Sequence, residues 1–240
     1  MQIPNEILWL IFLVADLLLA LLVFRLFGKT GLIAYIVLSI ITCNLQVLKL
    51  VDMFGVTTTL GNILYGSIFF CTDLLGESFG KKEAQRAVWI GFISVVLMTV
   101  FMQVALWFNP SEYDELHPHL AAIFGFMPRV VISSLIAYLL SQLHDVWAFH
   151  WWRERFKGRH LWLRNNASTV VSQALDSTIF VLLAFAPLPI LGAAPGMDSW
   201  EVIWQIWVTT YVIKLIVAVI DTPFIYWGRN LARRMQSVPG

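Results

Sequence analysis

The stretch EILWLIFLVADLLLALLVFRLF, residues 6–27, decides the class of this chain, because among these residues only Glu6, Asp16 and Arg25 are charged. A helix needs about 20 mainly apolar residues to cross the hydrocarbon core of a bilayer. The stretch meets that length and is too long for the apolar part of a signal peptide, which would also follow a basic segment. We therefore expect a membrane-spanning helix here and not a cleaved leader.

Further apolar runs of similar length predict that the chain crosses the membrane seven times. The 240 residues are 59% hydrophobic and 13% charged, whereas soluble domains carry about 25% charged residues. We predict an all-α, polytopic membrane protein with a compact bundle of seven transmembrane helices, forming a single transmembrane domain over residues 1–240. The predicted spans are residues 6–27, 31–50, 58–77, 86–108, 120–146, 165–187 and 200–228.

The charges of the connecting segments predict the orientation. Basic segments alternate with acidic or neutral ones along the chain, and a count of six or eight spans would break this alternation. The positive-inside rule then places the N-terminus outside and the C-terminus inside. The bases concerned are Arg25 and Lys29; Lys81, Lys82 and Arg86; Arg153, Arg155, Lys157, Arg159 and Arg164; and Arg229, Arg233 and Arg234.

The net charge of +1 shows no basic excess of the kind that nucleic-acid binding requires. The segment HWWRERFKGRHLWLR, residues 150–164, mixes bases with aromatic residues, and we interpret it as a loop against anionic lipid headgroups. Most of the 11 tryptophans lie near predicted span ends, which is typical of interfacial aromatic belts. We expect a lipid bilayer as partner and no nucleic acid.

Charged side chains inside the predicted spans point to a polar solute that crosses. An ionised group at the bilayer centre costs roughly 2.5–3.5 kcal/mol even on the mildest insertion scale. Lys214 lies near the centre of the last span and cannot reach the headgroups, so we expect a buried partner such as Asp176, which lies near mid-membrane in span six. Such a pair is an internal salt bridge, a substrate or proton site, or both.

Spans three and five carry further charges. Asp73 and Glu77 are four residues apart and share a helix face. Their like charges repel, so one is protonated or matched by a cation, or Glu77 reaches water at the cytoplasmic end. In span five, Pro128 predicts a kink or break. Arg129 follows it, and because its charge is fixed it should face a carboxylate or a polar cavity.

Spans two and six contain uncharged polar groups at depth. Asn44 in span two needs a hydrogen-bond partner, and Lys49 near its outer end either extends to the headgroups or serves a site. In span six, polar residues recur at intervals of four, three and four residues and share one helical stripe. Such a stripe also suits simple helix–helix association. Its members are Asn165, Thr169, Ser172 and Asp176.

The motifs of enzymes, cofactor sites and metal sites are missing from the sequence. We find neither a Gly-x-Ser-x-Gly elbow, nor His-Glu-x-x-His, nor a glycine-rich phosphate loop. Cys43 and Cys71 fit no zinc spacing, so we expect them to be small buried residues. We therefore predict no catalytic residues, no cofactor and no metal.

Five motifs resemble the queuosine precursor transporter family, earlier grouped as vitamin uptake transporters. They cover roughly residues 28–230, in the order of the family. One departure is Phe79, where the family commonly has Tyr. The runs are FGKTGLIAY (27–35), CTDLLGESFGKKEAQRAVWIGF (71–92), PRVVISSLIAYLLSQLHDVWAF (128–149), LRNNASTVVSQALDSTIF (163–180) and YVIKLIVAVIDTPFIY (211–226).

The resemblance implies import of a 7-deazaguanine base, queuine or one of its bacterial precursors, across the cytoplasmic membrane for the queuosine modification of transfer RNA. It also implies a six-helix core preceded by an extra first span. Alternatives are a binding subunit of an energy-coupling-factor type importer and, disfavoured by the missing motifs, an intramembrane enzyme. A homo-oligomer is compatible with the sequence.

A flat guanine-like ligand suits the polar residues of the spans. One carboxylate accepts two hydrogen bonds from the adjacent N–H and amine of such a base, and amides or guanidinium donate to its carbonyl and ring nitrogens. Aromatic walls would come from Tyr65, Phe69 and Phe70. The candidate substrate-binding residues are Asn44, Asp73, Glu77, Arg129, Asn166, Gln173, Asp176 and Lys214.

Overall fold

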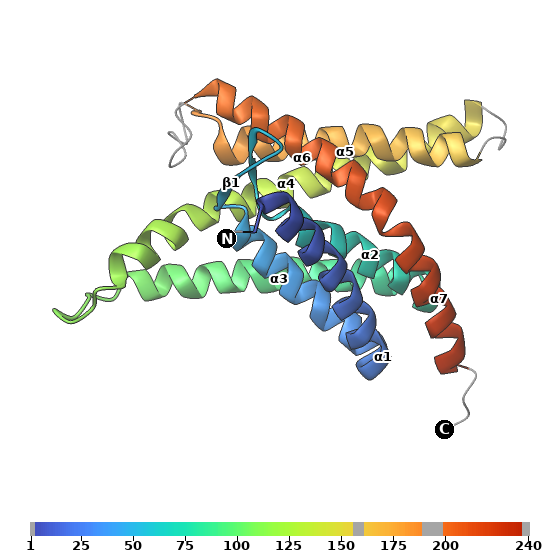
Figure 1. Ribbon diagram of the computed structural model, residues 1–240, viewed down its shortest axis with the longest axis horizontal. Coiled ribbons are helices and arrows are strands. Elements are labelled where there is room, and N and C mark those ends of the chain that lie inside the picture. Colours follow the sequence, from blue (N-terminus) through green and yellow to red (C-terminus); the bar gives the residue numbers. More distant parts are fainter. Residues whose placement is uncertain (1–2, 156–160, 189–198, 237–240) are drawn as a thin grey trace. The chain divides into compact units, whose positions relative to one another are not determined.

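The computed structural model describes residues 3–155, 161–188 and 199–236, and most of these residues are helical (Figure 1). The helical fold is therefore confirmed, although two short strands depart from the predicted all-α fold. In chain order the elements are α1 (Asn5–Gln46), β1 (Leu50–Met53), β2 (Val56–Thr59), α2 (Asn62–Phe79), α3 (Lys81–Leu106), α4 (His117–Arg155), α5 (Leu161–Phe185), α6 (Trp200–Ile220) and α7 (Thr222–Gln236).

The chain folds into two compact units. Unit 1 comprises Met1–Met127 and Ile216–Gly240, and unit 2 comprises Pro128–Leu215. Helix α4 passes from unit 1 to unit 2 at Pro128, and α6 returns to unit 1 at Ile216. The single transmembrane domain expected over residues 1–240 stays a prediction.

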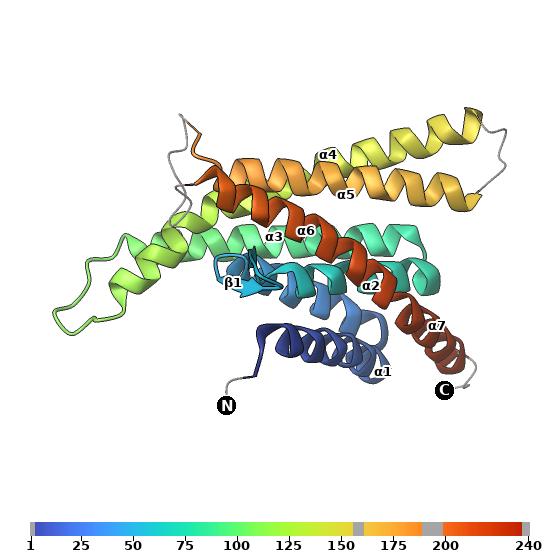
Figure 2. The same ribbon diagram turned by 45° about the horizontal axis from the view of Figure 1, so that its top comes forward.

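Helix α1 contains the first two predicted spans as the two arms of a hairpin. At the turn, Gly28 has φ 57° and ψ −138°, a conformation that residues with a Cβ rarely adopt. The two arms run side by side in Figure 2, and the hydroxyl of Tyr35 on the second arm donates to the Asp16 carboxylate on the first. The predicted interruption between residues 27 and 31 is therefore confirmed.

The core of unit 1 is built by α1, α2 and α3. Leu17, Phe24 and Ile36 of α1 and Leu74 of α2 are fully buried, and Gly91 of α3 packs directly against Ile40 of α1. Lipid tails are as apolar as leucine, so helix association in a membrane depends on close packing more than on the hydrophobic effect. Small residues at such contacts let the backbones approach.

A short β-hairpin joins α1 to α2 and was missed at the sequence level. Strands β1 and β2 pair antiparallel, with Met53 opposite Val56 around the two-residue turn Phe54-Gly55. Both turn residues have positive φ, 55° and 77°, as a type I′ turn requires. The strand residues 56–59, Val-Thr-Thr-Thr, are β-branched, and they delay the start of α2 to Asn62 instead of residue 58.

The helices α4, α5 and α6 form unit 2. Helix α4 continues through Pro128, so the alternative of a break is wrong, whereas the alternative of a kink stays a prediction. The guanidinium of Arg129 on α4 donates from Nε to the carbonyl oxygen of Leu183 at 2.8 Å, which joins α4 to the C-terminal turn of α5. The indole of Trp207 on α6 donates to the hydroxyl of Thr178 on α5 at 2.8 Å. Side chains therefore connect each neighbouring pair of helices in the chain order of this unit.

The last predicted span, residues 200–228, is divided in the structure. Helix α6 ends at Ile220 and α7 begins at Thr222. Asp221 still donates its backbone N–H to Val217, and its carbonyl still accepts from Ile225. Pro223 has no N–H to continue this ladder, so the helix is interrupted at this point. Gly228 then lets α7 lie close to Leu74 of α2.

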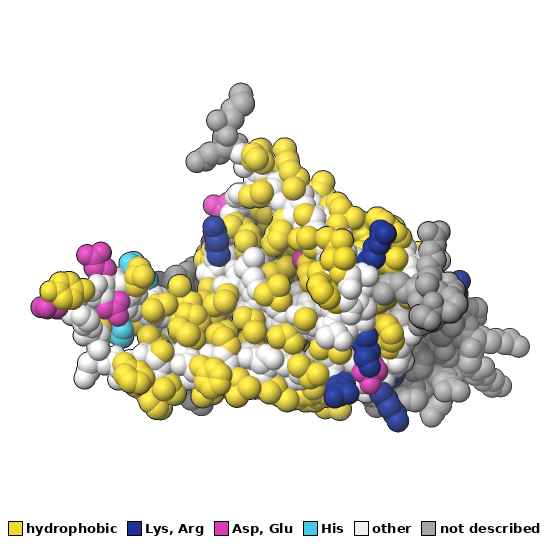
Figure 3. Space-filling model, turned by 90° about the horizontal axis from the view of Figure 1, so that it is seen from below, with side chains coloured by type: hydrophobic (Ala, Val, Ile, Leu, Met, Phe, Trp, Pro, Cys, Tyr) yellow, Lys and Arg dark blue, Asp and Glu magenta, His cyan; other side chains and the backbone are white. Residues whose placement is uncertain are grey.

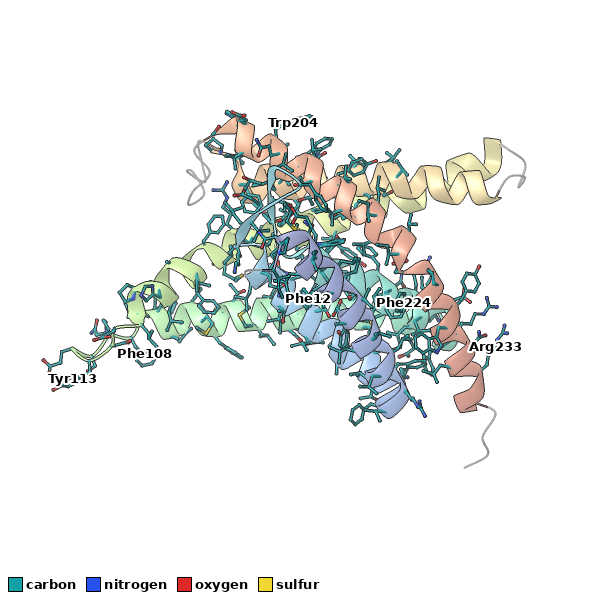
Figure 4. All side chains as sticks on the ribbon, viewed as in Figure 1. Phe12, Phe108, Tyr113, Trp204, Phe224 and Arg233 are labelled. Carbon is teal, nitrogen blue, oxygen red and sulfur yellow. The ribbon has the colours of Figure 1, made fainter. Side chains whose placement is uncertain are left out.

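Among the described residues, four helical segments are long and apolar enough to cross a membrane: Asn5–Gln46, Lys81–Leu106, His117–Ser141 and Trp200–Val217. Figure 3 shows apolar side chains over much of the visible surface and several acidic side chains gathered with histidines. The segment that follows α3 carries the exposed Tyr113 at its tip (Figure 4). Several long helices with exposed apolar side chains are typical of a multi-pass membrane protein.

Replacing Gly28 by Ala should destabilise the protein by about 1–3 kcal/mol, because a Cβ is strained at this φ and ψ. The matched control is Gly125→Ala in α4, where a Cβ meets nothing within 4 Å and removing a helical glycine should stabilise by about 0.5–1 kcal/mol. Thermal melting of the purified variants in detergent measures both. A Gly28→Ala protein that melts at or above the wild-type temperature would contradict the strained turn.

Candidate functional site

A buried ion pair joins α5 to α6 in unit 2. The ammonium of Lys214 contacts the carboxylate of Asp176, and the two side chains are 8% and 5% exposed. The hydroxyl of Ser141 on α4 lies 3.5 Å from the other carboxylate oxygen of Asp176. The expected partner of Lys214 is thereby confirmed, and three helices converge on one carboxylate.

The pair presents opposite charges side by side in a setting with little water. A lysine ammonium has three donor hydrogens, and a carboxylate offers about four acceptor positions. The pair therefore places hydrogen-bond donors and acceptors side by side, which are the two kinds of group that a polar ligand would contact. Its net charge is zero, which suits a neutral polar ligand better than an ion.

Two other predicted site residues of unit 2 lie on α5 or in contact with its C-terminal turn. Gln173 is one turn before Asp176 on α5, and its carbonyl oxygen Oε1 is buried without a hydrogen-bond partner among the described residues. Arg129 donates to the carbonyl oxygens of Leu183 and Ala186. These contacts cap the C-terminus of α5, where a cation also favours the helix dipole. The side chain of Asn166 lies outside the described residues.

The stripe predicted on span six is only partly visible. Ser172 contacts a ring nitrogen of His144 on α4 at 3.2 Å, and Asp176 contacts Ser141. Both contacts join α5 to α4, which supports helix association for the serine. The side chains of Asn165 and Thr169 lie outside the described residues.

An aromatic ladder on α6 was missed at the sequence level, where tryptophans were read as interfacial. The rings of Trp204 and Trp207 stack with centroids 4.9 Å apart, and those of Trp207 and Tyr211 with centroids 5.9 Å apart. Trp204 is exposed and labelled in Figure 4. Trp207, Tyr211 and Lys214 recur at intervals of four and three residues, so the ladder follows the helix face that leads to the ion pair. That spacing could have predicted the aromatic ladder from the sequence.

The carboxylate of Asp16 forms a second buried polar cluster, in unit 1. It accepts from the hydroxyl of Tyr35 and from that of Ser67 on α2. Asp16 is 2% exposed and Ser67 is fully buried. The cluster ties both arms of α1 to α2. Asp16 is one of the three charged residues of the first predicted span but is not among the predicted site residues.

The carboxylates predicted on α2 have a third acidic neighbour. Asp221, at the junction of α6 and α7, lies close enough to Asp73 for the two charges to interact, and Asp73 interacts likewise with Glu77. Asp221 is buried, whereas Asp73 and Glu77 are exposed. Arg229 of α7 lies 3.8 Å from Glu77. Of the alternatives left open for the two carboxylates, Arg229 is a cation beside Glu77, and the 54% exposure of the Glu77 side chain also lets it reach water.

The remaining predictions concern residues of unit 1. Asn44 is buried and donates to the carbonyl oxygen of Ile40 in its own helix at 2.8 Å. Lys49 is exposed after the end of α1. Tyr65 and Phe69 are in edge-to-face contact, whereas Phe70 is fully buried.

Cys43 and Cys71 are buried, as the sequence predicted, and they are not joined in a disulfide. Within the described parts of the chain, no three His, Cys, Asp or Glu side chains are grouped to hold a metal ion.

Comparisons with known proteins agree on one family. Residues 59–228 match the family model described as "Putative vitamin uptake transporter". A Bacillus subtilis (strain 168) protein named "Probable queuosine precursor transporter" is 42% identical over 228 residues, which are 95% of this chain and 96% of that protein. An Escherichia coli (strain K12) "Queuosine precursor transporter" is 26% identical over 184 residues, 76% and 78% of the two chains. A Haemophilus influenzae (strain ATCC 51907 / DSM 11121 / KW20 / Rd) "Probable queuosine precursor transporter" is 25% identical over 181 residues, 75% and 72%. No solved structure matches this chain.

Replacing Lys214 by Met should destabilise the protein by about 3–5 kcal/mol, because it leaves the Asp176 carboxylate buried without its partner. Adding Asp176→Asn to this variant should recover a large part of the loss. The matched control is Lys29→Met, which breaks the pair with Glu83 whose side chains are 42% and 27% exposed. That loss should stay below about 1 kcal/mol. Equal shifts in melting temperature for Lys214→Met and Lys29→Met would refute a buried pair.

Proposed function

Because this chain belongs to the vitamin uptake transporter family, we propose that it imports a queuosine precursor, a 7-deazaguanine base, across the cytoplasmic membrane. The names of the three relatives support this substrate. The base is released unchanged, so the protein acts as a transporter and not as an enzyme.

The observation that carries the proposal is the Asp176–Lys214 pair. A guanine-like edge presents N–H donors beside a carbonyl acceptor. The carboxylate of Asp176 accepts hydrogen bonds from such donors, and the ammonium of Lys214 donates to such an acceptor. A precursor base without a charged substituent is neutral, as the pair is, so its binding adds no net charge at membrane depth. Trp207 and Tyr211 offer ring faces on the same helix for stacking against a flat base.

The acidic residues of unit 1 support recognition of a precursor that carries an aminomethyl cation. Asp73, Glu77 and Asp221 gather more negative charge than the single arginine, Arg229, seen beside them can neutralise. A cationic substituent would reduce the repulsion among these carboxylates.

Seven membrane crossings, with the N-terminus outside, fit the contacts within unit 1. On the side expected to be cytoplasmic, Lys29 after the first span pairs with Glu83 before the fourth at 3.2 Å. On the other side, Asn5 donates to the carbonyl oxygen of Asp52 at 2.9 Å, and Glu6 accepts from the backbone of Phe54. Segments expected on one side of the membrane therefore contact each other. Arms 5–27 and 29–46 of α1 would count as two crossings, and α6 with α7 as one.

Proteoliposomes that contain only this chain should accumulate a radiolabelled 7-deazaguanine precursor, and the chain should restore queuosine in transfer RNA of a host that cannot synthesise the base. Asp176→Asn should reduce the initial uptake rate at least about tenfold, since charge-assisted hydrogen bonds are roughly twice as strong as neutral ones. Glu112→Gln, in the exposed segment after α3, is the matched control and should transport like the wild type.

Two results would overturn parts of this proposal. Absence of precursor uptake in both assays would refute the function itself. Uptake in cells but not in proteoliposomes would instead favour a binding subunit that depends on a separate energising module. Chromatography of the accumulated label checks that the base is chemically unchanged.

A further inference from the structure

Two buried hydroxyl groups in unit 2 have no hydrogen-bond partner among the described residues. They are Oγ of Ser177 on α5 and Oγ1 of Thr210 on α6. Ser177 is fully buried and Thr210 is 3% exposed. A buried polar group without a partner costs free energy, so its retention requires an explanation. Neither residue was expected at the site from the sequence.

Both hydroxyls lie at the level of the Asp176–Lys214 pair. Ser177 follows Asp176 directly, and Thr210 lies one helical turn before Lys214. A turn rises about 5.4 Å, so each hydroxyl is within about one turn of the ion pair along its helix. Contacts between α5 and α6 occur on both sides of Thr210, from Trp207 to Thr178 and from Lys214 to Asp176. Gln173 Oε1, also buried without a partner, lies one turn before Ser177.

Neighbouring residues show that a serine or threonine in these helices can bond the backbone of its own helix. Serine and threonine in a helix commonly bond the carbonyl one turn earlier. Thr178, next to Ser177, does so with Ala174 at 2.7 Å, and Thr209, next to Thr210, does so with Gln205 at 2.7 Å. Ser133 on α4 likewise bonds Arg129 at 2.6 Å. Ser177 and Thr210 instead hold their hydroxyls away from this internal acceptor.

We propose that Ser177 and Thr210 determine substrate specificity by donating hydrogen bonds to the carbonyl and ring-nitrogen acceptors of the base that the Asp176–Lys214 pair binds. This inference rests on the proposed function and extends it to two further residues. A hydroxyl both donates and accepts, so it satisfies an acceptor on the base without adding charge. Gln173 Oε1, which only accepts, complements an N–H of the same base.

Ser177→Ala and Thr210→Val should each raise the KM for precursor uptake about 3- to 10-fold in proteoliposomes, as the loss of one neutral hydrogen bond predicts. The melting temperature of the substrate-free protein should stay unchanged or rise, because each change removes an unpartnered buried polar group. Ser133→Ala and Thr209→Val remove hydroxyls that bond their own helix and serve as matched controls with wild-type KM. Thr210→Ser keeps the hydroxyl and should keep the KM near that of the wild type.

A substrate analogue distinguishes direct contact from indirect packing effects. A 7-deazapurine that keeps the exocyclic amine but lacks the carbonyl oxygen should bind the wild type at least about tenfold more weakly than the precursor. In the Ser177→Ala/Thr210→Val double variant this difference should shrink to about threefold or less, because both hydroxyl donors are gone and Lys214 alone remains to donate to the carbonyl. Competition against labelled precursor measures both affinities.

The outcomes separate this inference from the proposed function. If the wild type transports the precursor and the two variants keep wild-type KM and analogue discrimination, the inference is refuted while the function stands. If Ser177→Ala and Thr210→Val raise the KM but also lower the melting temperature of the substrate-free protein, the hydroxyls are structural and the inference is again refuted. If the wild type shows no uptake of any 7-deazaguanine, the proposed function is refuted, and the inference that rests on it is refuted as well.

Discussion

The contact between Asp176 and Lys214 is the constraint on which unit 2 depends. The Lys214 side chain is only 8% exposed, so its charge must be matched within the protein. Pairing it with Asp176 fixes how α6 packs against α5, and Ser141 brings α4 to the same carboxylate. The pair is neutral as a whole but strongly polar in its parts. That combination allows a site to bind an uncharged, hydrogen-bonding solute at a depth where a single ion would be too costly.

In unit 1, too, a buried carboxylate joins several helical segments. Asp16, on the first arm of α1, accepts from Tyr35 on the second arm and from Ser67 on α2. The family model matches residues 59–228, so both arms of α1 precede the matched region. Even so, α1 supplies fully buried residues such as Leu17 and Phe24. Both arms of α1 are therefore an integral part of this unit, joined to α2 in the matched region by a buried carboxylate.

How well a feature could be predicted from the sequence depended on the kind of interaction that produces it. Apolar length located a helix for every predicted span, and the cost of an isolated charge identified Asp176 as the partner of Lys214. Local departures from regular helices were harder to predict. The β-hairpin depends on a two-residue turn in which Phe54 has a positive φ. The interruption between α6 and α7 at Asp221 depends on Pro223. The contacts of Arg129 could not be foreseen, because its acceptors are backbone carbonyls 54 and 57 residues away. Ser177 and Thr210 resemble other helical hydroxyls in sequence, and only the missing internal bond distinguishes them.

The most direct test of the central claim is an experimental structure of the chain in lipid with a bound 7-deazaguanine. The account predicts that an N–H of the base lies about 2.7–3.2 Å from an Asp176 carboxylate oxygen, with Lys214 still in contact with the pair. A base bound elsewhere, with the Asp176–Lys214 pair intact and touching no part of it, would contradict the account.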